Sequence, residues 1–198
     1  MSPHHDPDGP QAHGGQVRAI MRHFPHAPRP FIDLSTGINP QAYPLDMPAP
    51  AALARLPEAD EENDLRAAAA AAYGAASPDM VATAPGSQSL ISLLPRIVPA
   101  TSACIMGPTY SGHETAWRHA GITVRIVHDL HGLMEQAKVP GTACVLCNPN
   151  NTDGRVLCVS VLRALAGHCA AHGNTLIVDE AYADFDGPGI IPALPCPG

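Results

Sequence analysis

Short apolar runs alternate with helical patterns along most of the chain. The apolar or β-branched runs cover residues 80–84, 102–106, 123–127, 143–147 and 175–179. The stretches of helical character between them cover residues 87–98, 111–120, 129–138 and 156–172. Strands that alternate with helices are typical of βαβ units. The pattern predicts an α/β fold with a mostly parallel sheet and helices on both faces.

The region before this pattern has a different character. Residues 1–50 are rich in proline, glycine and histidine and show little periodicity, which indicates an extended arm. Residues 60–74 read DEENDLRAAAAAAYG, and this acidic first turn, run of helix formers and final glycine predict a helix. We therefore expect an N-terminal arm over residues 1–50 and a larger α/β domain over residues 51–198.

Charge and hydropathy exclude several classes of function. The formal net charge is −7, and the eleven arginine and lysine residues are scattered, so the chain lacks the basic stripe of a nucleic-acid-binding protein. The first residues lack the basic and apolar regions of a signal peptide, and no run approaches the roughly 18 apolar residues of a membrane span. We predict a cytoplasmic protein that binds neither nucleic acid nor membranes.

The six cysteines do not form the spaced framework of a disulfide-rich protein. They lie mostly inside apolar runs, so reduced and buried thiols are expected. Cys144 and Cys147 have the spacing of half a zinc site, but no second pair of Cys or His residues follows at a matching spacing. Core packing is the favoured interpretation, and no metal site is predicted.

The loops that follow the apolar runs carry the candidate chemistry. They read PGSQS at 85–89, GPTY at 107–110, NPNNTDG at 148–154 and EAY at 180–182. Ligands collect at the carboxyl ends of parallel strands, where these loops would meet. Any one loop is explained by ordinary turn residues. The four together indicate a binding site.

Two of these loops suit an anion and a flat ring. The Pro-Gly turn before Ser87 and Gln88 leads directly into a helix, whose first amides have no partner within the helix. A serine helix cap explains the same residues equally well. Tyr110 follows the next run and is able to stack on a heteroaromatic ring.

The other two loops suit the polar atoms of such a ring. The asparagines of residues 148–154 are able to donate to a phenolate oxygen, and Tyr182 adds a second donor. Asp179 ends a wholly apolar run, so its carboxylate needs a cationic or hydrogen-bonding partner. A protonated pyridine nitrogen would be such a partner.

The order of these motifs resembles a known family. The anion loop, the aromatic residue, NPNN at 148–151 and VDEAY at 178–182 are similar to the large domain of fold-type I pyridoxal phosphate (PLP) enzymes, in the branch of histidinol-phosphate aminotransferase. HGG at 13–15 and FIDLSTGINPQAYP at 31–44 resemble the threonine-phosphate decarboxylase branch, which makes aminopropanol phosphate for cobalamin. The resemblance runs from about residue 13 to the end.

The resemblance implies roles for individual residues. Around PLP it places Ser87 and Gln88 at the phosphate, Tyr110 against the ring, Asn151 and Tyr182 at the ring oxygen, and Asp179 at the pyridine nitrogen. Tyr110 and Asp179 would act directly in catalysis. His13 and Gly14 would lie near the substrate's phosphate, and Asn39 near its carboxylate. Residues 1–50 would include part of a small domain.

The sequence departs from the family at several positions. Thr152 replaces a proline and should leave its loop less rigid, and Asp153 replaces a common threonine. Leu56 stands where related aminotransferases have a tyrosine. The family's Schiff-base lysine follows the DEAY motif, whereas Lys138 precedes it. We therefore expect the chain to be the N-terminal part of an enzyme, ending before that lysine and inactive alone.

The leading hypothesis is PLP-dependent decarboxylation of L-threonine O-3-phosphate by a homodimeric enzyme. One alternative is an aminotransferase of the histidinol-phosphate type. Decarboxylation and transamination break different bonds at the α-carbon of the substrate, and the groups that select the bond are not among these motifs. Another is a non-catalytic anion-binding or cofactor-binding remnant.

Overall fold

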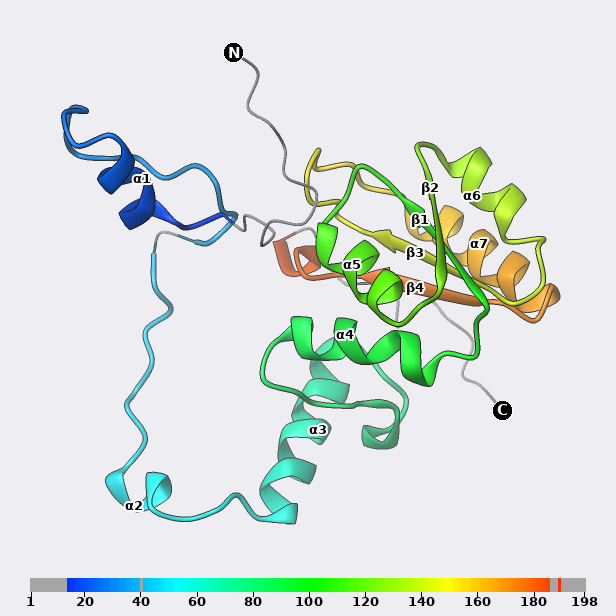
Figure 1. Ribbon diagram of the computed structural model, residues 1–198. Coiled ribbons are helices and arrows are strands. Elements are labelled where there is room, and N and C mark those ends of the chain that lie inside the picture. The colour runs from blue at the N-terminus through cyan, green and yellow to red at the C-terminus, as the bar shows by residue number, and fades with distance from the viewer. Residues whose placement is uncertain (1–13, 40, 186–188, 190–198) are drawn as a thin grey trace. The chain divides into compact units, whose positions relative to one another are not determined.

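The computed structural model describes residues 14–39, 41–185 and 189, and it divides between Arg55 and Leu56 into two compact units. The N-terminal unit contains the short helices α1 (Val17–His23) and α2 (Pro50–Leu53) (Figure 1). The sequence pattern predicts an extended arm here, so α1 is an element that it misses. None of the side chains of α1 is buried, which explains why the helix has little apolar periodicity.

The second unit is built on a parallel sheet. Its strands are β1 (Ser102–Met106), β2 (Thr123–Val127), β3 (Thr142–Cys147) and β4 (Thr175–Asp179), in the order β2-β1-β3-β4. Every pairing between neighbouring strands is parallel. The predicted α/β fold class is therefore confirmed.

Helices cover both faces of this sheet (Figure 1). The helices α4 (Ser87–Ile97) and α5 (Ser111–His119) lie on one face, and α6 (Leu130–Gln136) and α7 (Val159–Ala171) lie on the other. In the described part of the chain, no helix combines the length and the apolar character that a membrane span requires.

Two cores form because successive residues of a strand point to opposite faces of the sheet. The core under α6 and α7 includes Cys104, Met106, Leu133, Cys144, Leu165 and Cys169. The core under α4 and α5 includes Ala103, Ile105, Trp117 and Val145, with Leu94 packed against them. Four cysteines are buried as predicted, but Cys158 is exposed at the start of α7.

The strand predicted at residues 80–84 is absent. Pro78–Met80 instead form the 3-10 helix η1, and residues 81–84 have no regular structure. The guanidinium group of Arg66, on helix α3 (Ala59–Tyr73), donates to the carbonyl oxygens of Pro78 and Val81 at 2.9–3.1 Å. These hydrogen bonds satisfy carbonyl groups that a strand would present to a neighbour. A second 3-10 helix, η2 (Ala183–Phe185), follows β4.

Candidate functional site

A pocket of about 160 Å³ lies at the carboxyl ends of β3 and β4, beside the first turn of α4. Its lining includes five of the six residues that the sequence places at a cofactor: Ser87, Tyr110, Asn151, Asp179 and Tyr182. The parallel sheet brings them together because the loops after parallel strands emerge at the same edge. The structure thus assembles one site from segments almost a hundred residues apart.

The sixth residue, Gln88, contacts the pocket through Tyr110. The Tyr110 hydroxyl donates to Gln88 Oε1 at 2.7 Å, and Gln88 Nε2 donates to Ser92 Oγ at 3.1 Å. A Cβ atom on Gly112 would collide with the Tyr110 ring and would lie 2.8 Å from Gln88 Oε1. The absence of a side chain at Gly112 therefore provides the space that Tyr110 and Gln88 occupy.

Helix α4 presents its N-terminal end to the pocket. Gly86 precedes the helix with a φ of 83°, a left-handed conformation that favours glycine, and Ser87 is the first helical residue. Backbone amides in the first turn of a helix lack partners within the helix and attract anions. Because Ser87 also lines the pocket, this end of α4 is suited to bind an anionic group there.

Asp179, which is partly buried, forms a pair with a buried residue that the sequence analysis misses. His113 Nε2 lies 2.9 Å from Asp179 Oδ2, and the Ala181 amide donates to Asp179 Oδ1 at 3.0 Å. The hydrogen bond from His113 lowers the pKa of Asp179 and outweighs burial, which acts to raise it. The Asp179 carboxylate is therefore ionised at neutral pH.

His113 is held in its charged form. Burial acts to lower the pKa of His113, but hydrogen bonds to Asp179 and Cys147, with electrostatic attraction to both, raise it to about 9. One feature of the sequence could have pointed to His113. Tyr110 directly precedes α5, and His113 lies in the first turn of that helix, close to the predicted site. Cys147, the last residue of β3, also lines the pocket, although the sequence analysis assigns it only to the core.

The loop after β3 is tied by side chains. Asn150 is almost fully buried, and its Nδ2 donates to Asp153 Oδ1 at 2.7 Å. Asn150 Oδ1 accepts from Thr109 Oγ1 at 2.7 Å, and Asp153 Oδ1 accepts from the Arg155 amide at 3.0 Å. The hydrogen bond from Asn150 is the main cause of a lowered pKa for Asp153. Asp153 thus orders a loop in which Thr152 replaces the family's proline.

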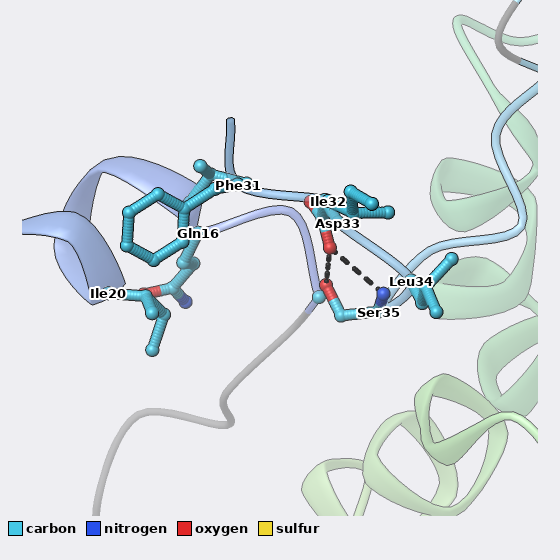
Figure 2. A pocket seen from close by; sticks show the side chains of 9 residues that line it. Gln16, Ile20, Phe31, Ile32, Asp33, Leu34 and Ser35 are labelled. Atoms are coloured by element: carbon cyan, nitrogen blue, oxygen red, sulfur yellow. Dashed lines mark hydrogen bonds between the residues drawn. The ribbon is translucent and has the colours of Figure 1, made fainter. Parts of the chain in front are cut away.

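The structure describes two of the three residues placed at the substrate, and both belong to the N-terminal unit. Gly14 lines a pocket of about 660 Å³ whose wall also includes Ile20 and Phe31 (Figure 2). The neighbouring Gly15 amide donates to Ser35 Oγ at 2.8 Å. Asn39 is exposed, and its Oδ1 accepts from the Gln41 amide at 2.9 Å. His13 lies outside the described residues.

The chain also matches the model of a known family. Residues 30–189 match the family model "Aminotransferase class I and II". The chain belongs to this family. The match begins in the N-terminal unit and includes every strand and helix that contributes residues to the pocket. The resemblance to PLP-dependent enzymes of this family, inferred from the loop motifs, is therefore confirmed.

Proteins similar to this chain include decarboxylases. A threonine-phosphate decarboxylase from Sinorhizobium sp. is 36% identical over 178 residues, which cover 89% of this chain and 52% of the relative. The chain thus spans about half the length of this curated relative. The L-threonine-O-3-phosphate decarboxylase from Porphyromonas gingivalis has a TM-score of 0.55 over 66% of this chain and 39% of its own, and at 22% identity it shows the shared fold.

A third relative is an aminotransferase with a bound cofactor. The histidinol-phosphate aminotransferase from Sinorhizobium meliloti, solved in complex with pyridoxal 5'-phosphate, is 28% identical. It covers 69% of this chain and 42% of its own chain, with a TM-score of 0.54. PLP, the cofactor inferred from the sequence, is thus the cofactor bound in this similar structure.

Proposed function

We propose that this chain forms the PLP site of a decarboxylase that acts on L-threonine O-3-phosphate. The observation that carries the proposal is an ionised carboxylate, that of Asp179, in a pocket that also contains Tyr110 and the start of α4. A carboxylate with a lowered pKa is suited to accept a hydrogen bond from a protonated ring nitrogen.

The groups around the pocket fit three features of PLP. Its phosphate suits the anion-binding end of α4 at Ser87, and its flat ring suits the face of Tyr110. Its pyridine nitrogen suits Asp179, which would hold a proton on that atom. When bound, PLP takes up the electron pair released as a bond to the substrate's α-carbon breaks.

Each residue then has a defined task. Ser87 and Gln88 bind the phosphate through the first turn of α4, and Gln88 also holds Tyr110 in place through its hydrogen bond at 2.7 Å. Asn151 and Tyr182 donate to the ring oxygen from the pocket wall. His113 keeps Asp179 ionised and oriented, which makes it a positioning residue for the proposed acid.

We favour decarboxylation over amino transfer because this chain is more similar to the decarboxylase than to the solved aminotransferase. The decarboxylase relative is 36% identical over 89% of this chain, whereas the solved histidinol-phosphate aminotransferase is 28% identical over 69%. The motif at residues 31–44, which resembles the decarboxylase branch, favours the same reaction. An aminotransferase is the second candidate, supported by the PLP-bound structure.

The same resemblance supports the remaining parts of the proposal. The product would be aminopropanol phosphate for cobalamin, made by a cytoplasmic homodimer. Gly14 and His13 would bind the substrate's phosphate, and Asn39 would bind its carboxylate.

Absorbance titration with PLP tests the cofactor site directly. Asp179→Asn removes the negative charge at the ring nitrogen, so we expect PLP to bind at least about tenfold more weakly. Asp64→Asn, on the exposed face of α3, is the matched control and should bind PLP as the parent does. Equal affinity for PLP in both variants would contradict the role of Asp179.

The reaction is tested with L-threonine O-3-phosphate on a PLP-loaded enzyme that contains this chain together with the family's Schiff-base lysine. A decarboxylase releases carbon dioxide without any added 2-oxo acid. An aminotransferase needs a 2-oxo acid to accept the amino group and releases no carbon dioxide. Amino transfer without carbon dioxide release would reject decarboxylation and leave the PLP site in place.

A further inference from the structure

A cluster of metal-binding atoms lies beside the pocket, and two of its residues, Cys147 and Asp179, line it. His113 Nε2, Cys147 Sγ and a carboxylate oxygen of Asp179 all lie within 4.8 Å of one another, and in the described residues they are the group of three that could hold a metal ion. We propose that this cluster binds a zinc ion when the pocket contains no cofactor. The proposal does not rest on the proposed PLP function, although Asp179 belongs to both sites.

The three ligand types are those that zinc prefers. Zinc takes thiolate, imidazole and carboxylate ligands in a tetrahedral arrangement, with bonds of about 2.0–2.3 Å that set ligand atoms roughly 3.3–3.5 Å apart. The distance of 2.9 Å between His113 Nε2 and Asp179 Oδ2 is slightly shorter than the separation of ligand atoms around zinc. The three ligand atoms lie within 4.8 Å of one another, and this upper limit is longer than that separation. A small rotation of these side chains would therefore bring the three atoms around one ion.

The sheet holds two of the three ligands side by side. Cys147 and Asp179 are partners in the register of β3 and β4, so their side chains leave the sheet on the same face. The Asn148 amide donates to the Asp179 carbonyl oxygen at 2.8 Å, which extends this pairing past the end of β3. His113 comes from the first turn of α5. A site whose ligands lie on paired strands needs little ordering when it binds an ion.

Burial and an open fourth position complete the geometry. His113 is 1% exposed and Cys147 is 5% exposed, so an ion there would be shielded from bulk water. Cys147 and Asp179 also line the pocket of about 160 Å³, which leaves room for a water molecule as the fourth ligand. The Ala181 amide, 3.0 Å from Asp179 Oδ1, would orient the carboxylate.

Zinc binding would exclude the proposed cofactor contact. The ion would replace the hydrogen bond between His113 and Asp179 and would release the protons of the imidazole and thiol. Asp179 would then be unable to accept a hydrogen bond from a ring nitrogen. Zinc and PLP should therefore compete for the chain.

Zinc titration against a chelator, with cobalt(II) as a spectroscopic probe, tests the site without PLP. We expect one ion per chain and a charge-transfer absorption from thiolate to cobalt. Cys147→Ser should abolish that absorption and weaken zinc binding at least about tenfold. The control is Cys158→Ser, which removes the exposed thiol and should leave both measurements unchanged.

Several outcomes would overturn the proposal. They are a cobalt complex of the parent without thiolate absorption, zinc affinity unchanged by Cys147→Ser, or loss of binding in Cys158→Ser instead. The cobalt spectrum of the parent decides the matter even if Cys147→Ser does not fold. Failure of the PLP site would leave the zinc titration unchanged, so the two proposals fail independently. Full binding of zinc and PLP together would overturn the shared use of Asp179.

Discussion

His113 Nε2 lies 2.9 Å from Asp179 Oδ2, so a fully buried imidazole supports the carboxylate that lines the pocket. The two residues are 66 positions apart and come from α5 and β4. Cys147 lies beside this pair, and the Tyr110 ring packs edge-on against His113, with 6.2 Å between the ring centroids. The pair gives the folded state a charge arrangement that the unfolded chain lacks.

We predict that the stability of the chain falls as the pH rises from about 6.5 to 9. Burial opposes the shift, but the contacts with Asp179 and Cys147 raise the pKa of His113 from 6.5 to about 9. A pKa raised by folding stabilises the folded state fully below the unfolded value, and this stability is lost as the pH rises through the folded value. Asp179, whose pKa is lowered from 3.8 by His113, contributes stability above that value and loses it in acid.

Urea unfolding of the parent and His113→Asn, in buffer with a metal chelator, measures this effect. The difference in free energy of unfolding between them should be largest below about pH 6.5 and should shrink towards pH 9. His119→Asn, exposed at the end of the same helix, should behave as the parent. A difference that stays constant over this range would contradict the prediction.

Gly112→Ala should weaken PLP binding without unfolding the protein. Alanine suits the helical backbone, but its methyl group would displace the Tyr110 ring from Gln88. We expect a loss in PLP affinity of roughly three- to tenfold, as for about one hydrogen bond. Gly167→Ala on α7 is the control, because apart from its chain neighbours and the nearby backbone of its own helix, no atom lies within 4 Å of the position that its added methyl group would take. It should keep the parent's affinity and add about 0.5–1 kcal/mol of stability.

Asn150→Ala should destabilise the chain by about 1–3 kcal/mol, since it removes the partners of buried polar groups. The substitution breaks the hydrogen bonds to Thr109 and Asp153, both at 2.7 Å. Thr152→Ala changes an exposed residue of the same loop and should stay within about 0.5 kcal/mol of the parent. Urea midpoints compare the three proteins. A neutral Asn150→Ala would show that the loop does not depend on this network.

Borohydride reduction in the presence of PLP should not trap a stoichiometric adduct on Lys138, the single lysine of the sequence. Lys138 Nζ lies 2.6 Å from Glu135 Oε1, and both side chains are about half exposed. Lys138 precedes β3, whereas the pocket follows it, so the strand's length of roughly 16 Å separates them. Peptide mapping detects any adduct, and Lys138→Arg should bind PLP as the parent does. Specific labelling of Lys138 would contradict this placement.

The loops show how far sequence reasoning reaches. Asp179 is recognisable because an acid at the end of an apolar strand needs a partner, and Ser87 because a helix starts there. The partner of Asp179 was not predictable. His113 and Cys147 look like ordinary helix and core residues until β3, β4 and α5 pack together.

The sequence by itself determined the parallel α/β fold and the edge at which its loops meet, because hydrophobic periodicity and turn residues are local properties of the chain. It also determined the family, through motifs that are short and contiguous. Tertiary structure alone decided that η1 replaces a predicted strand, since Arg66 satisfies carbonyl groups 12 and 15 residues away. It also decided that His113, Cys147 and Asp179 share one site, because contacts between distant segments leave no periodic signal in the sequence.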